Sequence, residues 1–205
     1  MLDLIIVAAL AVALLTAVLA YFGVPTLLAQ RWGRLALMVG AGVVPLMATA
    51  GGLRVGYRES SSTRFCMECH EMTPYGTSLF ADNANSLPAV HYQSRLIDRE
   101  ETCYACHADY ALFGDVKTKL NGLQHVWVHY AGEAQSPIEL YQPYPNSNCL
   151  HCHEDARSYL ESRGHQAPGL LAELQAGSTS CLGCHRVAHD FDSVQAGHLW
   201  EAEPR

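Results

Sequence analysis

The residues best suited to chemistry in this sequence are its eight cysteines, which all belong to one repeated pattern. The pattern is Cys-x-x-Cys-His, which is typical of covalent c-type haem attachment. Two thiols add across the vinyl groups on one edge of a haem, and the next residue places its imidazole beneath the iron as an axial ligand. We therefore expect four haem c groups. The attachment thiols are Cys66, Cys69, Cys103, Cys106, Cys149, Cys152, Cys181 and Cys184, and the axial histidines are His70, His107, His153 and His185.

Other uses of paired cysteines explain this pattern less well. A structural zinc site has no need of a histidine after each Cys-x-x-Cys pair. A thioredoxin-like site needs one pair rather than four, and a disulfide framework gives no reason for the trailing histidine. Haem is attached in this way outside the cytoplasm, so the motifs place their domain in the bacterial periplasm or its equivalent.

Seven further histidines form a surplus that suggests sixth ligands for the irons. His151 lies inside a motif spacer and His198 lies in the C-terminal tail, so we expect neither to bind iron. Two strong axial ligands close an iron to substrate and leave electron transfer as its role. The remaining candidates are His91, His125, His129, His165 and His189.

Residues 115–130 have the pattern of an amphipathic helix, with Asp115 as its expected cap and Gly132 as its stop. Apolar residues recur along one stripe of this helix, whereas His125 and His129 fall on the opposite face, one turn apart. The pair could be a surface pair opposite a core-facing stripe. Alternatively, the stripe faces haem or lipid and at least one histidine binds iron. The stripe consists of Val116, Leu120, Leu123, Trp127 and Tyr130.

Two uncharged segments of 19 residues, 4–22 and 35–53, are each long enough to cross roughly 30 Å of hydrocarbon as a helix. No Lys or Arg precedes Arg31. A cleaved signal peptide needs a basic start, so we expect the first segment to be retained. The predicted fold is mainly α, with a membrane anchor of two transmembrane helices at residues 1–56 and a loop-rich, helical multihaem domain at residues 57–205.

Basic residues bear on the orientation of the two predicted spans. Arg31 and Arg34 lie in the short connector and favour its placement in the cytoplasm, whereas Arg54, Arg58 and Arg64 follow the second span and argue the other way. The haem chemistry decides between them. We expect a multi-pass protein of the inner membrane with both termini outside the cytoplasm and the haem domain in the periplasm.

The predicted haem domain is acidic, with 10 Lys and Arg against 19 Asp and Glu from Val55 onward. Nucleic acid is therefore not an expected partner. A basic docking surface on a redox protein fits better, because complementary charge raises encounter rates. A merely solvated acidic surface is the alternative.

Residues 65–72 contain the longer pattern Cys-x-x-Cys-His-x-Met. With four haem motifs behind a membrane span, this resembles the NapC/NirT/NrfH family of membrane-anchored tetrahaem quinol dehydrogenases, from the second span to about His189. The resemblance implies that membrane quinol binds beside the first haem and releases its protons to the outside. It also implies that the electrons pass one at a time through the haems to a periplasmic reductase.

The resemblance assigns roles to individual residues. Met72 resembles the family's axial methionine on the first haem, so either it or His70 would ligate that iron. His91 resembles the distal histidine that precedes the second motif. His189 resembles the histidine that ligates the second haem, and His165 resembles the histidine upstream of the fourth motif.

The helix with Lys117 and Lys119 matches the region of the family's quinol-site lysine and aspartate, and His125 falls about where that aspartate would be. Removing electrons from quinol makes its hydroxyls strongly acidic, and a group with a pKa near ambient pH suits proton transfer best. His fits that requirement without a large shift. We expect Lys117, Lys119, His125 and Asp115 to form the catalytic site.

The sequence departs from the family in three features of its iron ligands and its membrane anchor. The family usually has a histidine where this chain has Tyr110, so one distal ligand must come from elsewhere, and His125 or His129 is the expected replacement. The spacing from His185 to His189 is one residue shorter than in the family. The family typically has one membrane span, whereas this sequence predicts two.

Three functions compete at this point. The first is an enzyme that oxidises membrane quinol and exports electrons to a periplasmic partner. The second is a permanent electron-transfer subunit of a larger membrane complex that delivers electrons toward quinone. The third is a redox or haem-based sensor, for which the sequence has no visible signalling segment.

Overall fold

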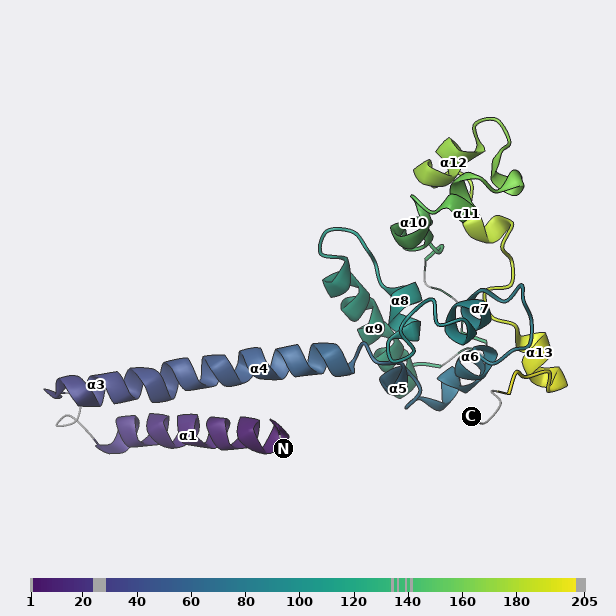
Figure 1. Ribbon diagram of the computed structural model, residues 1–205. Coiled ribbons are helices and arrows are strands. Elements are labelled where there is room, and N and C mark those ends of the chain that lie inside the picture. Colours follow the sequence, from purple (N-terminus) through teal and green to yellow (C-terminus); the bar gives the residue numbers. More distant parts are fainter. Residues whose placement is uncertain are drawn as a thin grey trace. The chain divides into compact units, whose positions relative to one another are not determined.

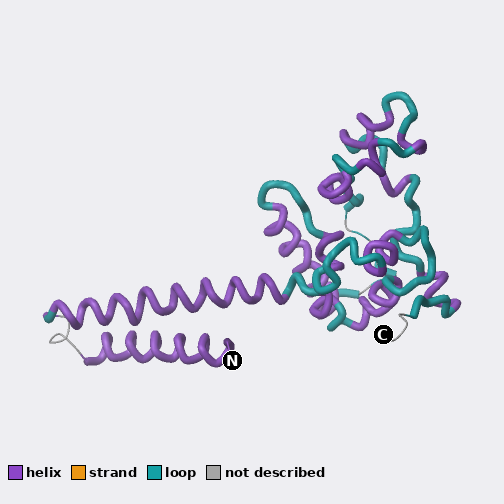
Figure 2. Tube along the Cα trace, viewed as in Figure 1, coloured by secondary structure: helices purple, strands orange, loops and turns teal. Residues whose placement is uncertain are grey.

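The computed structural model describes residues 2–23, 29–133, 135, 137, 138, 140 and 142–201. Its elements are helices joined by loops, as Figures 1 and 2 show. Within the described residues there is no strand, and the isolated bridge between Ala81 and Leu199 is the β-type pairing found there. The prediction of a mainly α fold is confirmed. The chain divides into two compact units, Met1–Ser60 and Ser61–Arg205, each of which is described by itself.

The first unit is a helical hairpin. Helix α1 spans Leu2–Gly23. After the connector, helix α3 (Arg31–Met38) continues through a π-helical turn, η1 (Val39–Val43), into α4 (Val44–Glu59). Pro45 explains the π turn, because it has no N–H to donate to the carbonyl four residues earlier.

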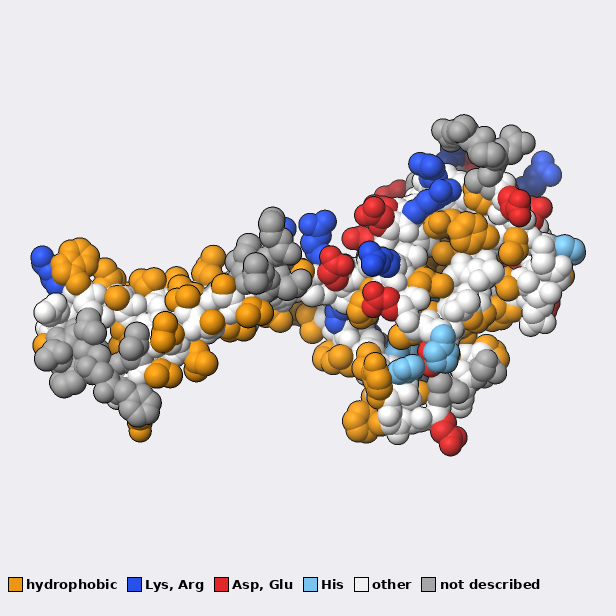
Figure 3. All heavy atoms as spheres, turned by 90° about the horizontal axis from the view of Figure 1, so that it is seen from below, with side chains coloured by type: hydrophobic (Ala, Val, Ile, Leu, Met, Phe, Trp, Pro, Cys, Tyr) orange, Lys and Arg blue, Asp and Glu red, His pale blue; other side chains and the backbone are white. Residues whose placement is uncertain are grey.

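Helix α1 packs against η1 and α4. A methyl group added at Gly40 would lie 2.7 Å from Thr16 Cγ2, so this glycine lets the two helices approach closely. Small residues have the same role in helix pairs within membranes, where van der Waals packing drives association. Hydrophobic side chains are spread along the described part of this unit's visible surface (Figure 3).

One helix in the described part of the chain, Arg31–Glu59, is long and apolar enough to cross a membrane. It contains the predicted span 35–53. Helix α1 occupies the position of the other predicted span, but the same criteria do not establish it as a span. The structure thus supports one of the two predicted transmembrane helices.

The second unit consists of short helices on long loops, with one longer helix, α9. The CxxCH motifs lie in or beside the short helices α5, α8, α10 and η4. The elements are α5 (Thr63–Cys66), η2 (His70–Met72), α6 (Thr73–Ser78), α7 (Leu87–Gln93), α8 (Thr102–His107), α9 (Gly114–Ala131), α10 (Ser147–His153), α11 (Arg157–Leu160), η3 (Arg163–His165), α12 (Leu170–Ala176), η4 (Cys181–Gly183) and α13 (Phe191–Ala196).

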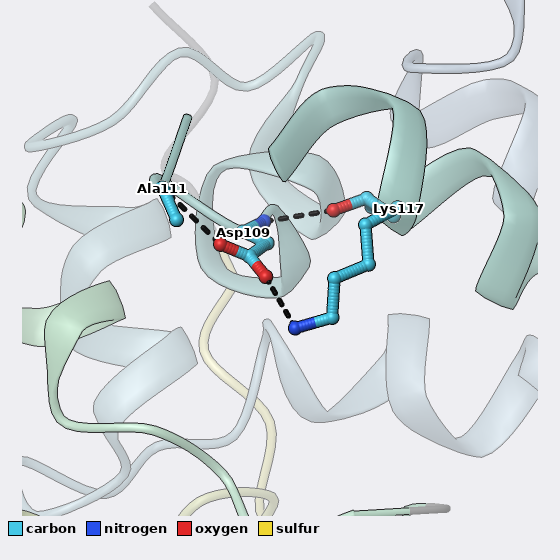
Figure 4. Close-up of polar contacts among 4 residues, drawn as sticks. Asp109, Ala111 and Lys117 are labelled. Atoms are coloured by element: carbon cyan, nitrogen blue, oxygen red, sulfur yellow. Dashed lines mark hydrogen bonds and ion pairs between the residues drawn. The ribbon is translucent and has the colours of Figure 1, made fainter. Parts of the chain in front are cut away.

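Helix α9 matches the predicted helix and stops at Gly132 as expected. The prediction of Asp115 as its cap is wrong, because the helix begins one residue earlier and Phe113, in a left-handed conformation, precedes it. Asp109 holds this start in place instead. Its carboxylate accepts hydrogen bonds from the Ala111 backbone and from Lys117, at 2.9 and 2.7 Å (Figure 4). A side chain at Gly114 would collide with the Asp109 carbonyl.

The apolar core of this unit is thin. The described part of the chain has seven buried hydrophobic residues, three of them alanines, and the hydrophobic cluster contains three of the seven. A conventional domain of this size buries more, so the interior needs a further apolar component. The cluster is Leu150, Tyr159 and Leu174.

Buried hydrogen bonds of Asn146 add to the contacts of this small apolar core. Its buried amide donates to the carbonyls of Leu174 and Thr179, at 2.8 and 2.7 Å, and accepts from the Cys181 backbone at 3.0 Å. These contacts join the third motif's helix α10 to α12 and to the fourth motif. A single side chain therefore fixes two attachment sites relative to each other.

Replacing Asn146 by alanine is expected to lower the free energy of unfolding by about 3 kcal/mol, because three backbone groups lose their partner. Guanidinium unfolding of the detergent-solubilised protein, followed by the haem absorption band, measures this change. Asn85→Ala is the matched control, since Asn85 is exposed. Equal unfolding midpoints for the two variants would contradict the structural role of Asn146.

Candidate haem sites

The attachment thiols are arranged by the local helices. In α8 and α10, each Cys-x-x-Cys pair lies three residues apart on a helix, which places both thiols on one face. The first motif begins at the end of α5, and the fourth coincides with the 3₁₀ turn η4. All eight cysteines are free thiols, as attachment to vinyl groups requires.

Each motif histidine lies opposite one other histidine. The ring centres of His107 and His189 are 6.4 Å apart and nearly parallel, at 13°. The distances for the remaining pairs are 6.0 Å for His91 and His153, 6.2 Å for His165 and His185, and 5.9 Å for His70 and His129.

These distances fit one iron between each pair of rings. A metal bound about 2.0 Å from an imidazole nitrogen on either side, with each nitrogen about 1 Å from its ring centre, needs ring centres about 6 Å apart. All four pairs meet this condition. A cavity of about 480 Å³ beside His91 and His185 lies within the usual size range of small-molecule sites.

The hydrogen bonds of the partner histidines determine which ring nitrogen is free. The Nδ1 atom of His91 lies 2.7 Å from the Leu87 carbonyl, and that of His165 lies 2.8 Å from the Tyr159 carbonyl. A carbonyl oxygen can only accept, so Nδ1 must donate in both cases. Nε2 is then the nitrogen that remains available to a metal.

Nε2 is also the available ring nitrogen of His189. Ser78 Oγ donates its single proton to the Tyr75 carbonyl at 2.6 Å, so at 2.8 Å it must accept from His189 Nδ1. Burial lowers the pKa of His189 to about 4, with a smaller contribution from His107. The imidazole is therefore neutral at physiological pH, which is the form that binds metals.

The Nδ1 proton of His129 is accepted by a carboxylate rather than by a carbonyl or a hydroxyl. Its Nδ1 lies 2.7 Å from Glu71 Oε1, and an ionised carboxylate can only accept. Backbone hydrogen bonding, and then His129, lower the pKa of Glu71, which keeps it ionised. Thus all four partner histidines present a free Nε2, and metal-binding histidines usually donate a hydrogen bond from the other ring nitrogen in this way.

Two predicted ligands lie outside these pairs. His125 lies close enough to His107 to lower that residue's pKa, the larger cause being burial, but the ring opposite His107 belongs to His189. Met72 ends the turn η2 that His70 begins. His151, which we did not expect to bind iron, also lies outside the pairs and stacks on Tyr110 with ring centres 3.8 Å apart.

Hydrogen bonds connect the motifs in chain order. The Thr63 amide, at the start of α5, donates to the Glu100 carbonyl just before α8, at 2.6 Å. The Asn148 side chain in α10 donates to the Cys106 carbonyl in α8, at 3.2 Å. Asn146 joins α10 to the fourth motif, so each motif neighbours the next. This order could not be predicted from the motifs, because the residues that create it lie outside the motif pattern.

The predicted catalytic residues separate into two groups. Asp115 accepts a hydrogen bond from the Tyr104 hydroxyl at 2.9 Å, and the Lys119 amine lies 4.2 Å from the centre of the Tyr104 ring. Lys119 also donates to Ser61 Oγ at 2.8 Å, and burial lowers its pKa. Lys117 turns instead toward Asp109, as Figure 4 shows. His125 lies further along α9, six residues after Lys119.

Repeated attachment motifs on a helical, loop-rich domain define a multihaem c-type cytochrome, a class that carries covalent haem and serves electron transport. The sequence profile for the N-terminal region of the NapC/NirT cytochrome c family matches residues 28–194. The chain belongs to this family.

Three curated relatives set the scale of the similarity. Cytochrome c-type protein NapC of Haemophilus influenzae is 22% identical over 191 residues, which cover 82% of this chain and 91% of that protein. The NapC of Escherichia coli K12 is 24% identical over 197 residues, which cover 85% and 92%. Cytochrome c-type protein TorC of the same strain is 26% identical over 184 residues, which cover 82% of this chain but 45% of TorC. No solved structure matches the chain.

Proposed function

We propose that this protein is a membrane-anchored tetrahaem cytochrome c that oxidises membrane quinol and passes the electrons through four haems to a periplasmic redox partner. The observation that carries the proposal is the set of four histidine pairs, each with ring centres about 6 Å apart and a free Nε2 on the partner histidine. Haem iron supplies a reversible one-electron acceptor at such a site.

The proposed axial pairs follow from the ring positions. Two imidazoles leave no open position on an iron, which restricts the site to electron transfer. His129 rather than His125 completes the first pair, and Met72 is the alternative ligand there on grounds of family resemblance. The pairs are His70 with His129, His107 with His189, His153 with His91, and His185 with His165.

The contacts between successive motifs support one route from the first site to the fourth. The first motif starts 13 residues after Leu53, within a chain segment that leaves the predicted membrane span. Lys119 of α9 is hydrogen-bonded to Ser61, two residues after the end of α4. Chain connectivity therefore keeps both the first motif and this part of α9 close to the end of the span, where a lipid-soluble donor is present.

Helix α9 offers the two kinds of surface that a quinol site needs. Asp115 and Lys119 approach each other around Tyr104, and a carboxylate beside a desolvated amine can receive protons from quinol hydroxyls. His125 lies on the same helix as a further proton acceptor, whereas Lys117 is a cation paired with Asp109. The apolar stripe is exposed along the helix, with Trp127 at 71% and Tyr130 at 82% exposure, and it is suited to contact with lipid or a quinol tail.

We also propose that α1 is a second membrane span, which would make the protein multi-pass in the inner membrane with its haem domain in the periplasm. Its close packing on η1 through Thr16 and Gly40 supports a hairpin of two spans. The acidic haem domain favours a redox partner with a basic docking surface.

One observation favours a second function. The chain has an extra apolar helix, α1, that could dock against the helices of a larger membrane complex. In that case the protein would be a permanent electron-transfer subunit that delivers electrons toward quinone. Rapid haem reduction by quinol in the purified chain supports the first function. Reduction by a co-purifying protein alone supports the second.

The intact mass of the mature protein under denaturing conditions is expected to exceed the polypeptide mass by four haems, because thioether bonds survive denaturation. Serine in place of both cysteines of one motif should remove one haem. Three or fewer haems in fully matured wild-type protein would contradict the tetrahaem proposal.

Alanine at each partner histidine is expected to open one iron. His91→Ala, His129→Ala, His165→Ala and His189→Ala should each convert one of four haems from low-spin to high-spin, measured by electron paramagnetic resonance. His198→Ala is the control and should change nothing, since His198 is exposed and lies outside the pairs. If His125→Ala or Met72→Ala opens the first iron and His129→Ala does not, the first pair is wrong.

Substitutions on α9 test the quinol site. Asp115→Asn and Lys119→Ala are expected to slow quinol-driven haem reduction by about 100-fold, the usual scale for loss of a proton acceptor, with haem content unchanged. Lys117→Ala should have a smaller effect, because Lys117 is paired with Asp109. Stopped-flow absorbance with a soluble quinol measures the rates. Wild-type rates in these variants and in His125→Ala would place the site elsewhere.

A further inference from the structure

The four partner histidines differ in the group that accepts their Nδ1 proton. Two donate to backbone carbonyls and one to a serine hydroxyl. His129 donates to the carboxylate of Glu71, which carries a full negative charge. The first site is therefore the one pair, among the four described, whose partner histidine is hydrogen-bonded to a charged group.

Glu71 is held firmly in this position. It follows His70 directly in the chain and lies in the turn η2, and its side chain is 17% exposed. Its second oxygen, Oε2, is buried and lacks a hydrogen-bond partner among the described residues. His129 is thus the described side chain that is hydrogen-bonded to this partly desolvated carboxylate.

The distances show which histidine is hydrogen-bonded to Glu71. Glu71 Oε1 lies 2.7 Å from His129 Nδ1 but 3.5 Å from His70 Nε2, which is too long for a good hydrogen bond. Nε2 of His70 is the nitrogen that would face the iron, and once bound it has no proton to give. The Nδ1 proton of His129 then remains as the donor to Glu71.

We propose that Glu71 is a positioning residue of the first haem: it fixes the orientation of His129 and lowers the reduction potential of that haem. A carboxylate acceptor increases the electron density of the imidazole and stabilises the more positive, oxidised iron. The inference rests on the proposed function, since it requires His129 to be the distal ligand. Nothing in the Cys-x-x-Cys-His-x-Met pattern assigns a role to the residue between His and Met.

The test is a potentiometric titration of the full-length, haem-loaded protein, followed by optical and paramagnetic resonance spectra. Glu71→Gln should make reduction of one haem about tenfold more favourable, leave the other three unchanged and keep all irons low-spin. Glu71→Asp retains the carboxylate and should restore much of the wild-type value. Glu68→Gln is the matched control, because Glu68 is an exposed acid in the same motif and its loss removes the same charge.

The outcomes separate this inference from the function on which it rests. If Glu71→Gln leaves all four potentials unchanged, or if Glu68→Gln shifts them equally, Glu71 has no specific role. His129→Ala tests the ligand pair independently. A high-spin haem in that variant, together with unchanged potentials in Glu71→Gln, would overturn the role of Glu71 alone. A low-spin spectrum in His129→Ala would overturn the first axial pair.

Discussion

Two imidazole rings must lie about 6 Å apart if a single iron is to bind both, and the second unit is organised around this constraint. Its helices are short and its apolar core is small, yet four histidine pairs hold this spacing. The Nδ1 atoms of the partner rings donate hydrogen bonds to Leu87, Tyr159, Ser78 and Glu71, which leaves Nε2 of each ring available. The hydrogen bonds of this unit position histidine rings, whereas few of its residues form an apolar core.

Helix α9 combines several tasks because its faces differ. Asp109 and Gly114 fix where it begins. One face carries His129 toward the first motif, and the opposite face leaves its apolar stripe exposed. An 18-residue helix extends about 27 Å at 1.5 Å per residue, so it can span a redox site and an apolar surface without a second element. One helix of this length is therefore sufficient for both roles in a small domain.

The local features were predictable from the sequence, and the long-range ones were not. The attachment motifs, the helical class and α9 follow from short spacings and periodicity. The choice of His129 over His125 does not, because the two residues share one helix face and only the tertiary position of the first motif distinguishes them. The Asp115 cap failed because Asp109, outside the helix pattern, holds the helix start. Glu71 was invisible because its role depends on a residue 58 positions away.

The sequence separation within each histidine pair also determines the order in which the paired sites can form. His165 and His185 are separated by 20 residues, whereas His107 and His189 are separated by 82. The entropy cost of loop closure grows with the logarithm of loop length, and between these two loops it differs by about 1 kcal/mol. With the proposed pairs, the site built on the fourth motif can form from a local segment, whereas the site built on the second motif stays incomplete until residue 189 is in place. During assembly, the proposed second haem site would therefore wait longer than the fourth for its partner histidine.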